Sequence, residues 1–367
     1  MDTLRADNRG LPAPMSHMAS LPWLQPRRIG VFRALMLGDM LCATPALRAL
    51  RSAWPEAHIT LIGLPWAAGL AQRLASIDDF LAFPGWPGLP ELPAPAPEQM
   101  RSFMGQIRRR HFDLAIQLHG SGQLTNALVT SFGAECNAGF GDEKTGFPAA
   151  DASRFVPWPE RGNEILRLLQ LTDHLGLPRR GVELDLPLTL EDYRRADALV
   201  SRKKPYAIVH AGSQLPSRRW PPQRFAAVAD RLAATGLTVV LTGTASEKLL
   251  VDSVASAMAH RPLDLCGETD LWTLGALLAS AQVLLCNDTG LSHMAAALGV
   301  PSVITACGSE IERWAPLNRH KHRVLSHEVA CRPCAHRECP LDHQCAKGLP
   351  VKLVTEAAIQ MANGEVA

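Results

Sequence analysis

Short apolar runs alternate with longer amphipathic stretches along this chain, from Arg28 almost to its end. The apolar runs that predict strands are residues 28–33, 58–63, 112–118, 205–210, 237–242, 281–286 and 301–305. Helical spacing of apolar residues marks 45–53, 66–76, 98–110, 161–176, 222–235, 245–259, 270–280 and 289–298. Such an alternation predicts parallel sheets with helices on both faces, which is the α/β class.

The alternation pauses at residues 178–190, where Pro178, Gly181 and Pro187 indicate a linker. A length of 367 residues also favours two domains. We expect two Rossmann-like, doubly wound domains that face each other across a cleft. Their expected bounds are a disordered N-terminal tail at 1–26, an N-terminal domain at 27–180, a C-terminal domain at 181–350 and a final helix at 351–367.

The composition indicates which kinds of partner and which cellular compartment this chain is suited to. Lys and Arg together number 37 and Asp and Glu 35, so the overall charge gives no reason to expect a nucleic-acid partner. The longest apolar run, 277–286, is too short to span a bilayer. Residues 1–26 lack the apolar segment of a secretory signal. Nine cysteines do not fit a disulfide framework, and a reducing cytoplasm fits best.

The stretch Asn287-Asp288-Thr289-Gly290-Leu291-Ser292-His293 directly follows an apolar run. This order predicts a strand, a tight turn and a helix start, with Asp288 as the N-cap. The N–H groups of Thr289, Gly290 and Leu291 would then be donors at the positive end of a helix, which is a site for anions. An ordinary capped helix is the alternative interpretation.

Asp39 stands in the same position of the first half, after the predicted strand at 28–33 and before a predicted helix. We expect it in the loop that enters this helix, at the carboxyl edge of the sheet, where open α/β sheets bind ligands. The alternative is a helix-capping carboxylate.

Two further strand ends add polar groups to the second half. Ser213 and Arg218 follow the strand at 205–210, and Glu247 follows the strand at 237–242. With the 289–291 amides they would line one crevice. A diphosphate is bound by backbone donors and a guanidinium fork, and a ribose by a carboxylate such as Glu247. The alternatives are a solvated surface charge for Arg218 and a first-turn helix acid for Glu247.

Three motifs together resemble glycosyltransferase family 9, the ADP-heptose:lipopolysaccharide heptosyltransferases and their relatives. The motifs are Gly38-Asp39 with Thr44-Pro45-Ala46-Leu47, then Arg218-Arg219-Trp220-Pro221, then the Asn287-to-His293 stretch. The resemblance covers about residues 28–358. It implies the glycosyltransferase B fold, metal-independent catalysis, an acceptor-binding N-terminal half and a C-terminal half that binds the nucleotide sugar.

The resemblance also implies roles for single residues. Asp39 matches the general base that deprotonates the acceptor hydroxyl. Arg218 occupies a position where many members have lysine, and it would hold the diphosphate together with Ser213 and the amides of 289–291. Glu247 would bind the ribose, and Asp288 and His293 would lie near the sugar.

The implied activity is an inverting transfer of a heptose, or a similar sugar, from an ADP-activated donor to a saccharide of the lipopolysaccharide core. The acceptor would be a saccharide or a lipid-linked saccharide. We therefore expect a cytoplasmic protein, with peripheral contact at the cytoplasmic face of the inner membrane. The alternatives are a heptosyltransferase acting on a protein or small molecule, and a non-catalytic nucleotide-sugar-binding module.

A cysteine-rich segment near the C-terminus forms the pattern Cys331-x2-Cys334-x4-Cys339-x5-Cys345, with His336 and His343 between the thiols. The first pair has the spacing of zinc sites. We expect a structural zinc or iron there, with free thiols or redox disulfides as alternatives. No cofactor is needed for catalysis, because the implied chemistry is complete without this segment.

Overall fold

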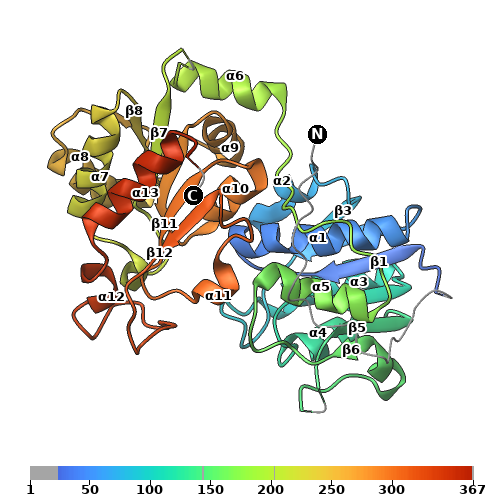
Figure 1. Ribbon diagram of the computed structural model, residues 1–367. Coiled ribbons are helices and arrows are strands. Elements are labelled where there is room, and N and C mark those ends of the chain that lie inside the picture. The colour runs from blue at the N-terminus through green and yellow to red at the C-terminus, as the bar shows by residue number, and fades with distance from the viewer. Residues whose placement is uncertain (1–23, 143, 202, 366–367) are drawn as a thin grey trace, which may run out of the picture.

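The computed structural model describes residues 24–142, 144–201 and 203–365, which form two α/β domains lying side by side (Figure 1). The first contains a six-stranded sheet of order β3-β2-β1-β4-β5-β6, and the second one of order β12-β11-β10-β7-β8-β9. Neighbouring strands pair in parallel throughout both sheets. The predicted fold class, two doubly wound domains, is confirmed.

The N-terminal domain alternates strands with helices and short 3₁₀ turns (η) as the sequence predicts. Its elements are β1 (Arg28–Phe32), α1 (Leu37–Ala53), β2 (His58–Gly63), η1 (Pro65–Ala67), α2 (Ala68–Ala71), β3 (Asp79–Ala82), α3 (Pro97–Arg109), β4 (Leu114–Gln117), α4 (Thr125–Thr130), β5 (Cys136–Phe140), η2 (Ala149–Arg154), β6 (Phe155–Val156) and α5 (Glu164–His174).

The C-terminal domain repeats this alternation. Its elements are α6 (Leu190–Leu199), β7 (Tyr206–His210), η3 (Pro216–Arg218), α7 (Pro222–Ala234), β8 (Thr238–Leu241), η4 (Ala245–Glu247), α8 (Lys248–Ala257), β9 (Leu263–Asp264), α9 (Leu271–Ala279), β10 (Val283–Asn287), α10 (Gly290–Leu298), β11 (Ser302–Thr305), α11 (Ile311–Trp314), β12 (His322–Leu325), α12 (Gln344–Lys347) and α13 (Val351–Ala362).

Several of these elements differ from the sequence prediction. The short edge strands β3, β6, β9 and β12 were not predicted, nor was β5. The predicted final helix ends at Ala362, and 366–367 lie outside the described residues. The predicted tail at 1–26 also lies outside them, apart from 24–26. Among the described residues, each helix is too short or too polar to span a bilayer.

The central strands are apolar on both faces because helices cover both sides of each sheet. In β1, Val31 pairs in register with Leu61 of β2 and Ile116 of β4, and all three are buried. In β10, Leu284 and Leu285 are fully buried between β7 and β11. These strands place the loops that follow β1 and β10 at the middle of each sheet's carboxyl edge.

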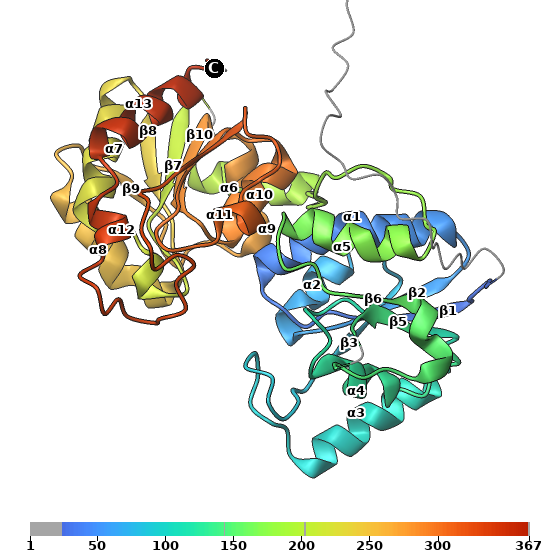
Figure 2. The ribbon, with the colours of Figure 1, turned by 60° about the horizontal axis from the view of Figure 1, so that its bottom comes forward.

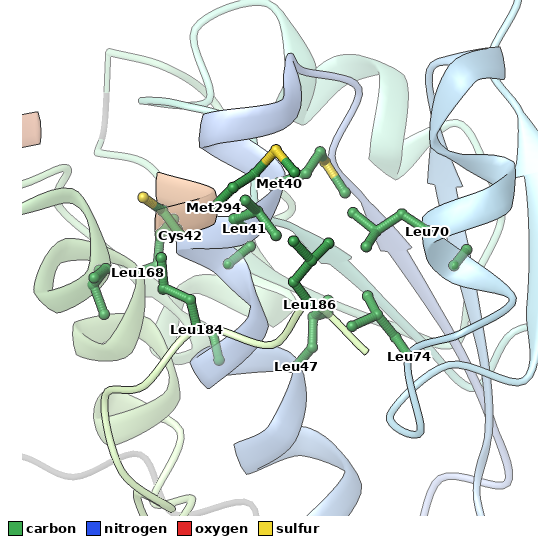
Figure 3. Packing of buried hydrophobic residues seen from close by; sticks show 14 of the residues in the cluster. Met40, Leu41, Cys42, Leu47, Leu70, Leu74, Leu168, Leu184, Leu186 and Met294 are labelled. Carbon is green, nitrogen blue, oxygen red and sulfur yellow. The ribbon is translucent and has the colours of Figure 1, made fainter. Parts of the chain in front are cut away.

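One apolar cluster runs through both domains. It joins Met40 and Leu41 of α1 to Met294 of α10, and it includes Leu184 and Leu186 of the linker (Figure 3). The linker lies along α1, where the Asp185 N–H donates to the Thr44 hydroxyl at 2.9 Å. Helices α1 and α10 are therefore packed against each other where the two domains meet.

Candidate functional site

Asp39 lies in the first turn of α1, close behind β1. The expectation that it sits in a loop before the helix is wrong, because the helix begins at Leu37 and continues past Pro45. Proline leaves the carbonyl four residues earlier without its helical donor. Here the Thr44 hydroxyl donates to that carbonyl, on Leu41, at 2.8 Å. Asp39 thus belongs to a helix N-terminus, which favours its negative charge.

The charges around Asp39 come from buried side chains. The Arg33 guanidinium is fully buried, and its NH2 lies 3.9 Å from Asp39 Oδ1 and 3.3 Å from Glu164 Oε1. Burial raises the pKa of Asp39 above its ordinary value, and the Arg33 charge opposes this rise while the Glu164 carboxylate adds to it. The side chain remains 24% exposed. It is therefore a reachable carboxylate that accepts protons more readily than an ordinary aspartate.

Glu164 connects this centre to the second domain. At the start of α5, its Oε2 accepts a hydrogen bond from Arg313 Nε of α11 at 2.8 Å. The neighbouring Asn163 donates from Nδ2 to the Ala315 carbonyl at 2.8 Å. A cavity of about 410 Å³ lies beside this junction and is lined from both domains. Neither Arg33 nor Glu164 is among the residues predicted from the sequence, and the available signal was an arginine at the end of the apolar run Val31-Phe32.

Helices α1 and α10 approach each other closely beside Asp39, at Gly38 of α1 and Gly290 of α10. A Cβ on Gly38 would lie 2.7 Å from the His293 ring, and a Cβ on Gly290 would lie 3.4 Å from the Gly38 nitrogen. His293 is buried, and burial lowers its pKa against the opposing charges of Asp288 and Asp39. The structure therefore brings Asp39, Asp288 and His293 together where the two helices begin.

The N-terminus of α10 differs in detail from the prediction. Thr289, rather than Asp288, is the N-cap, and its hydroxyl accepts from the Leu291 N–H at 3.4 Å. A hydroxyl at this position satisfies an N–H of the first turn as a carboxylate would. Within the described residues, no acceptor is found for the N–H groups of Thr289 and Gly290. These two amides are the open donors of this helix end.

The other strand ends of the second domain lie around the same edge. Ser213 is buried in the loop after β7. Glu247 adopts the helix-capping arrangement, since its Oε2 accepts from the Thr244 N–H and hydroxyl, each at 2.9 Å. Its other oxygen lies against the preceding strand end, because a Cβ on Gly212 would be 2.1 Å from Oε1. Glu247 is thus both a first-turn acid and a neighbour of the β7 loop.

Two arginines fix the 213–218 loop, and an asparagine holds the residues just before it. Arg219 donates from Nε and NH2 to the Ser213 carbonyl at 3.0 and 2.8 Å. Arg218 donates from NH2 to the Cys334 carbonyl at 3.0 Å, and its Nε is buried without a partner among the described residues. Asn287 donates from Nδ2 to the Ala211 carbonyl at 2.7 Å. The sequence places Asn287 at the strand end but does not predict this positioning role.

The four cysteines of the cysteine-rich segment (residues 331–345) are unpaired thiols, with Cys345 buried and Cys331 exposed. In the described residues, no group of three or more His, Cys, Asp or Glu side chains is close enough together to hold a metal ion. The described arrangement of Cys331, Cys334, Cys339 and Cys345 is therefore not a ligand set. The expected zinc or iron stays a prediction that requires these thiols to come together.

The N-terminal sheet presents a second group of loops at the edge that carries Asp39. His119 follows β4, and its Nδ1 accepts from the Ala34 N–H at 3.2 Å. Its Nε2 lies 3.5 Å from Glu91 Oε1, so the loop at 84–97 is joined to this edge. Hydrogen bonding to His119 lowers the pKa of Glu91 against the effect of burial. Exposed apolar side chains lie in the loops after β1, β2 and β4: Met36, Trp66 and Leu124.

Comparison with known proteins gives consistent matches. A sequence profile of glycosyltransferase family 9 (heptosyltransferase) matches residues 100–344. Lipopolysaccharide heptosyltransferase 2 of Escherichia coli K12 is 26% identical over 307 residues, which cover 79% of this chain and 85% of that protein.

Two solved structures have the same fold. The family 9 glycosyl transferase of Veillonella parvula aligns with a TM-score of 0.76 at 21% identity, covering 92% of this chain and 98% of that one. The ADP-heptose lipopolysaccharide heptosyltransferase II of E. coli aligns with a TM-score of 0.74 at 22% identity, covering 92% and 99%.

Proposed function

Because this chain belongs to glycosyltransferase family 9, the heptosyltransferase family, we propose that it transfers a heptose, or a similar sugar, from an ADP-activated donor to a saccharide of the lipopolysaccharide core. The single observation that carries this proposal is the place of Asp39. It is a partly exposed carboxylate with a raised pKa, and it lies where the N-termini of α1 and α10 meet. The names of the matched E. coli proteins support the donor and the acceptor class.

In the proposed reaction, Asp39 takes the proton of an acceptor hydroxyl. The acceptor oxygen forms a bond to the anomeric carbon of the donor, the bond from that carbon to the phosphate oxygen breaks, and ADP leaves with the electron pair. A base works best when its pKa approaches the working pH, so the raised pKa of Asp39 favours this step. The Arg33 charge opposes the rise in the pKa of Asp39 and so favours the ionised carboxylate that the reaction needs.

The leaving diphosphate develops negative charge, and fixed donors stabilise it best. The open amides of Thr289 and Gly290 at the start of α10, together with Ser213, would supply neutral donors. Arg218 would supply the positive charge with its guanidinium, which is held beside the loop by its bond to the Cys334 carbonyl. With these groups the leaving ADP needs no metal ion, so we propose metal-independent catalysis.

The remaining predicted site residues would contact either the ribose or the transferred sugar. Glu247 would accept hydrogen bonds from the ribose hydroxyls with Oε1, since Oε2 is occupied by Thr244. Asp288 and His293 would contact the transferred sugar near Asp39. Burial lowers the pKa of His293, so its ring is neutral near pH 7 and can both donate and accept hydrogen bonds.

The acceptor would bind at the N-terminal domain, between the 84–97 loop and Asp39. A lipid-linked acceptor would place this edge near the cytoplasmic face of the inner membrane. The exposed side chains of Met36, Trp66 and Leu124 support such a peripheral contact, because apolar side chains are stabilised by leaving water.

The test measures acceptor-dependent release of ADP. Purified protein is incubated with ADP-heptose and a series of lipopolysaccharide core saccharides, both free of heptose and carrying it, and the saccharide product is identified by mass spectrometry. The proposal expects transfer with inversion at the anomeric carbon. Binding of ADP-heptose without transfer to any core saccharide would contradict it, and it would leave a module that only binds nucleotide sugars or an enzyme with a protein or small-molecule acceptor.

A further inference from the structure

We propose that the cysteine-rich segment positions the 213–218 loop for the donor diphosphate, and that His343 is a positioning residue in this contact. The proposal rests on the proposed function, because it concerns the affinity of the same donor site. Figure 2 shows the segment, coloured red, beside the carboxyl edge of the second sheet where the loop after β7 lies. In this arrangement the segment acts on donor binding through the loop.

Ser217 lies at the centre of the loop's 3₁₀ turn. Its N–H, hydroxyl and carbonyl all form hydrogen bonds to the cysteine-rich segment. Its N–H donates to the Arg337 carbonyl at 3.0 Å, and its hydroxyl donates to the His336 carbonyl at 2.5 Å. Its carbonyl accepts from His343 Nε2 at 2.6 Å. Ser217 is only 2% exposed, so water cannot readily replace these bonds.

Arg218, the proposed diphosphate cation, is held by the same segment. Its NH2 donates to the Cys334 carbonyl at 3.0 Å. A 3₁₀ turn as short as Pro216–Arg218 has few internal hydrogen bonds of its own. The direction of the Arg218 guanidinium therefore depends on bonds from outside the turn.

The segment is itself attached to a second strand end. The Cys334 N–H donates to the Gly308 carbonyl at 2.7 Å. Arg332 donates from NH1 to the Ala306 and Ser309 carbonyls at 2.9 and 2.8 Å. Gly308 allows this close approach, since a Cβ there would lie 2.9 Å from Cys334 Cβ. The segment therefore bridges the loop after β11 and the loop after β7.

Such a bridge fixes the loop before the donor binds, so less conformational freedom is lost on binding. Loss of one bond to Ser217 should weaken the contacts to the diphosphate and leave those to the nucleoside and the acceptor unchanged. A segment with a purely structural role would instead change the melting temperature alone.

The experiment compares His343→Asn with Asp342→Asn. Both residues have left-handed backbone angles, φ of 54° and 53°, which asparagine tolerates well. The shorter asparagine at 343 cannot reach the Ser217 carbonyl, while the Asp342 side chain is 82% exposed and pairs with Lys347. Asp342→Asn is thus a matched control. Ser217→Ala, which removes the hydroxyl bond to His336, is a second test variant.

Calorimetry with ADP, UDP, GDP and adenosine gives the first readout. We expect His343→Asn and Ser217→Ala to weaken ADP binding about three- to tenfold, as loss of one buried hydrogen bond does, and to leave adenosine binding unchanged. Asp342→Asn should match wild type for both ligands. In transfer assays, the donor KM should rise while kcat and the acceptor KM stay constant.

Three results would overturn the proposal. Unchanged ADP affinity in His343→Asn, with or without a lower melting temperature, would leave a structural role only. An equal loss for ADP and adenosine would indicate general damage to the domain. If wild type binds none of the three nucleoside diphosphates, the proposed function fails first and this inference fails with it.

Discussion

Arg33 lies between two carboxylates, with its NH2 3.9 Å from Asp39 Oδ1 and 3.3 Å from Glu164 Oε1. One fully buried guanidinium thus serves both the proposed base and the residue that contacts Arg313 of the second domain. The domain contact and the proton affinity of Asp39 are therefore coupled electrostatically, because the charges of Arg33, Glu164 and Arg313 all act on the Asp39 carboxylate.

Asp39→Asn should keep donor affinity and lower turnover by roughly two to four orders of magnitude, as loss of a general base commonly does. Asparagine has nearly the same shape, but it cannot take up the proton of the acceptor hydroxyl. Steady-state transfer rates check this, and calorimetry with ADP is the control for folding and donor binding. Turnover within about threefold of wild type would remove Asp39 from the proposed role.

The pH dependence of kcat/KM should report the raised pKa of Asp39. The reaction needs the ionised carboxylate, so kcat/KM should fall as the pH drops through a pKa above the ordinary 3.8. Glu164→Gln removes a negative charge that raises this pKa, and its acid limb should move to lower pH. The pH profiles of kcat/KM for wild type and Glu164→Gln, measured in one set of buffers, test this expectation. An acid limb of wild type at or below the ordinary value would be incompatible with this picture.

Arg218→Ala should weaken the binding of ADP much more than the binding of adenosine, which lacks the diphosphate. A charge-assisted contact of this kind contributes about 1.5–3 kcal/mol. Calorimetry with both ligands measures the difference. Arg337→Ala is the matched control, since Arg337 is exposed and contacts Ser217 through its backbone carbonyl. Equal losses for the two ligands would place Arg218 away from the diphosphate.

Gly38→Ala should separate α1 from α10 and lower both stability and turnover. The added Cβ would lie 2.7 Å from the His293 ring, which is buried and cannot easily move. Overpacking of this kind costs about 1–3 kcal/mol of unfolding free energy. Gly105→Ala, inside α3 with its nearest contact at 3.5 Å from the flexible Arg109 side chain, should be neutral or stabilising. Chemical denaturation of both variants compares them.

Removal of a metal from the cysteine-rich segment should lower the melting temperature, because ligand binding contributes to folding free energy. Turnover should persist in the folded fraction, with a raised donor KM if the segment positions the 213–218 loop. Elemental analysis of reduced, tag-free protein is the decisive measurement. Less than about a tenth of an equivalent of zinc or iron, with all nine thiols titratable, would refute the metal prediction.

Sequence patterns located the parts of this site that depend on local order along the chain. The motif from Asn287 to His293 predicted a strand end and a helix start, and β10 and α10 lie there. The prediction of Asp288 as the N-cap is wrong by one residue, because the neighbouring Thr289 can equally accept from a first-turn N–H. Edge strands such as β6, Phe155–Val156, are too short for a periodic pattern to predict.

Contacts between distant residues could not be predicted. Arg33 and Glu164 are 131 residues apart, and Arg218 and Cys334 are 116 apart. The second of these bonds goes to a backbone carbonyl, which every residue carries, so no side-chain pattern indicates it. The first bond depends on how α5 packs beside α1 and β1 within the first domain, and the second on how the segment after β12 packs within the second domain.

The apolar contact of Met40 with the Met294 region also limits how the enzyme can move. Pulling the domains apart would wet this surface, at a cost of roughly 25 cal/mol for each Å² of apolar area exposed. Rotation of one domain across the other keeps the surface dry, and flexible methionine side chains adapt to it. We therefore expect the domains to move by a small shear of α1 along α10 and not by separation of the two helices.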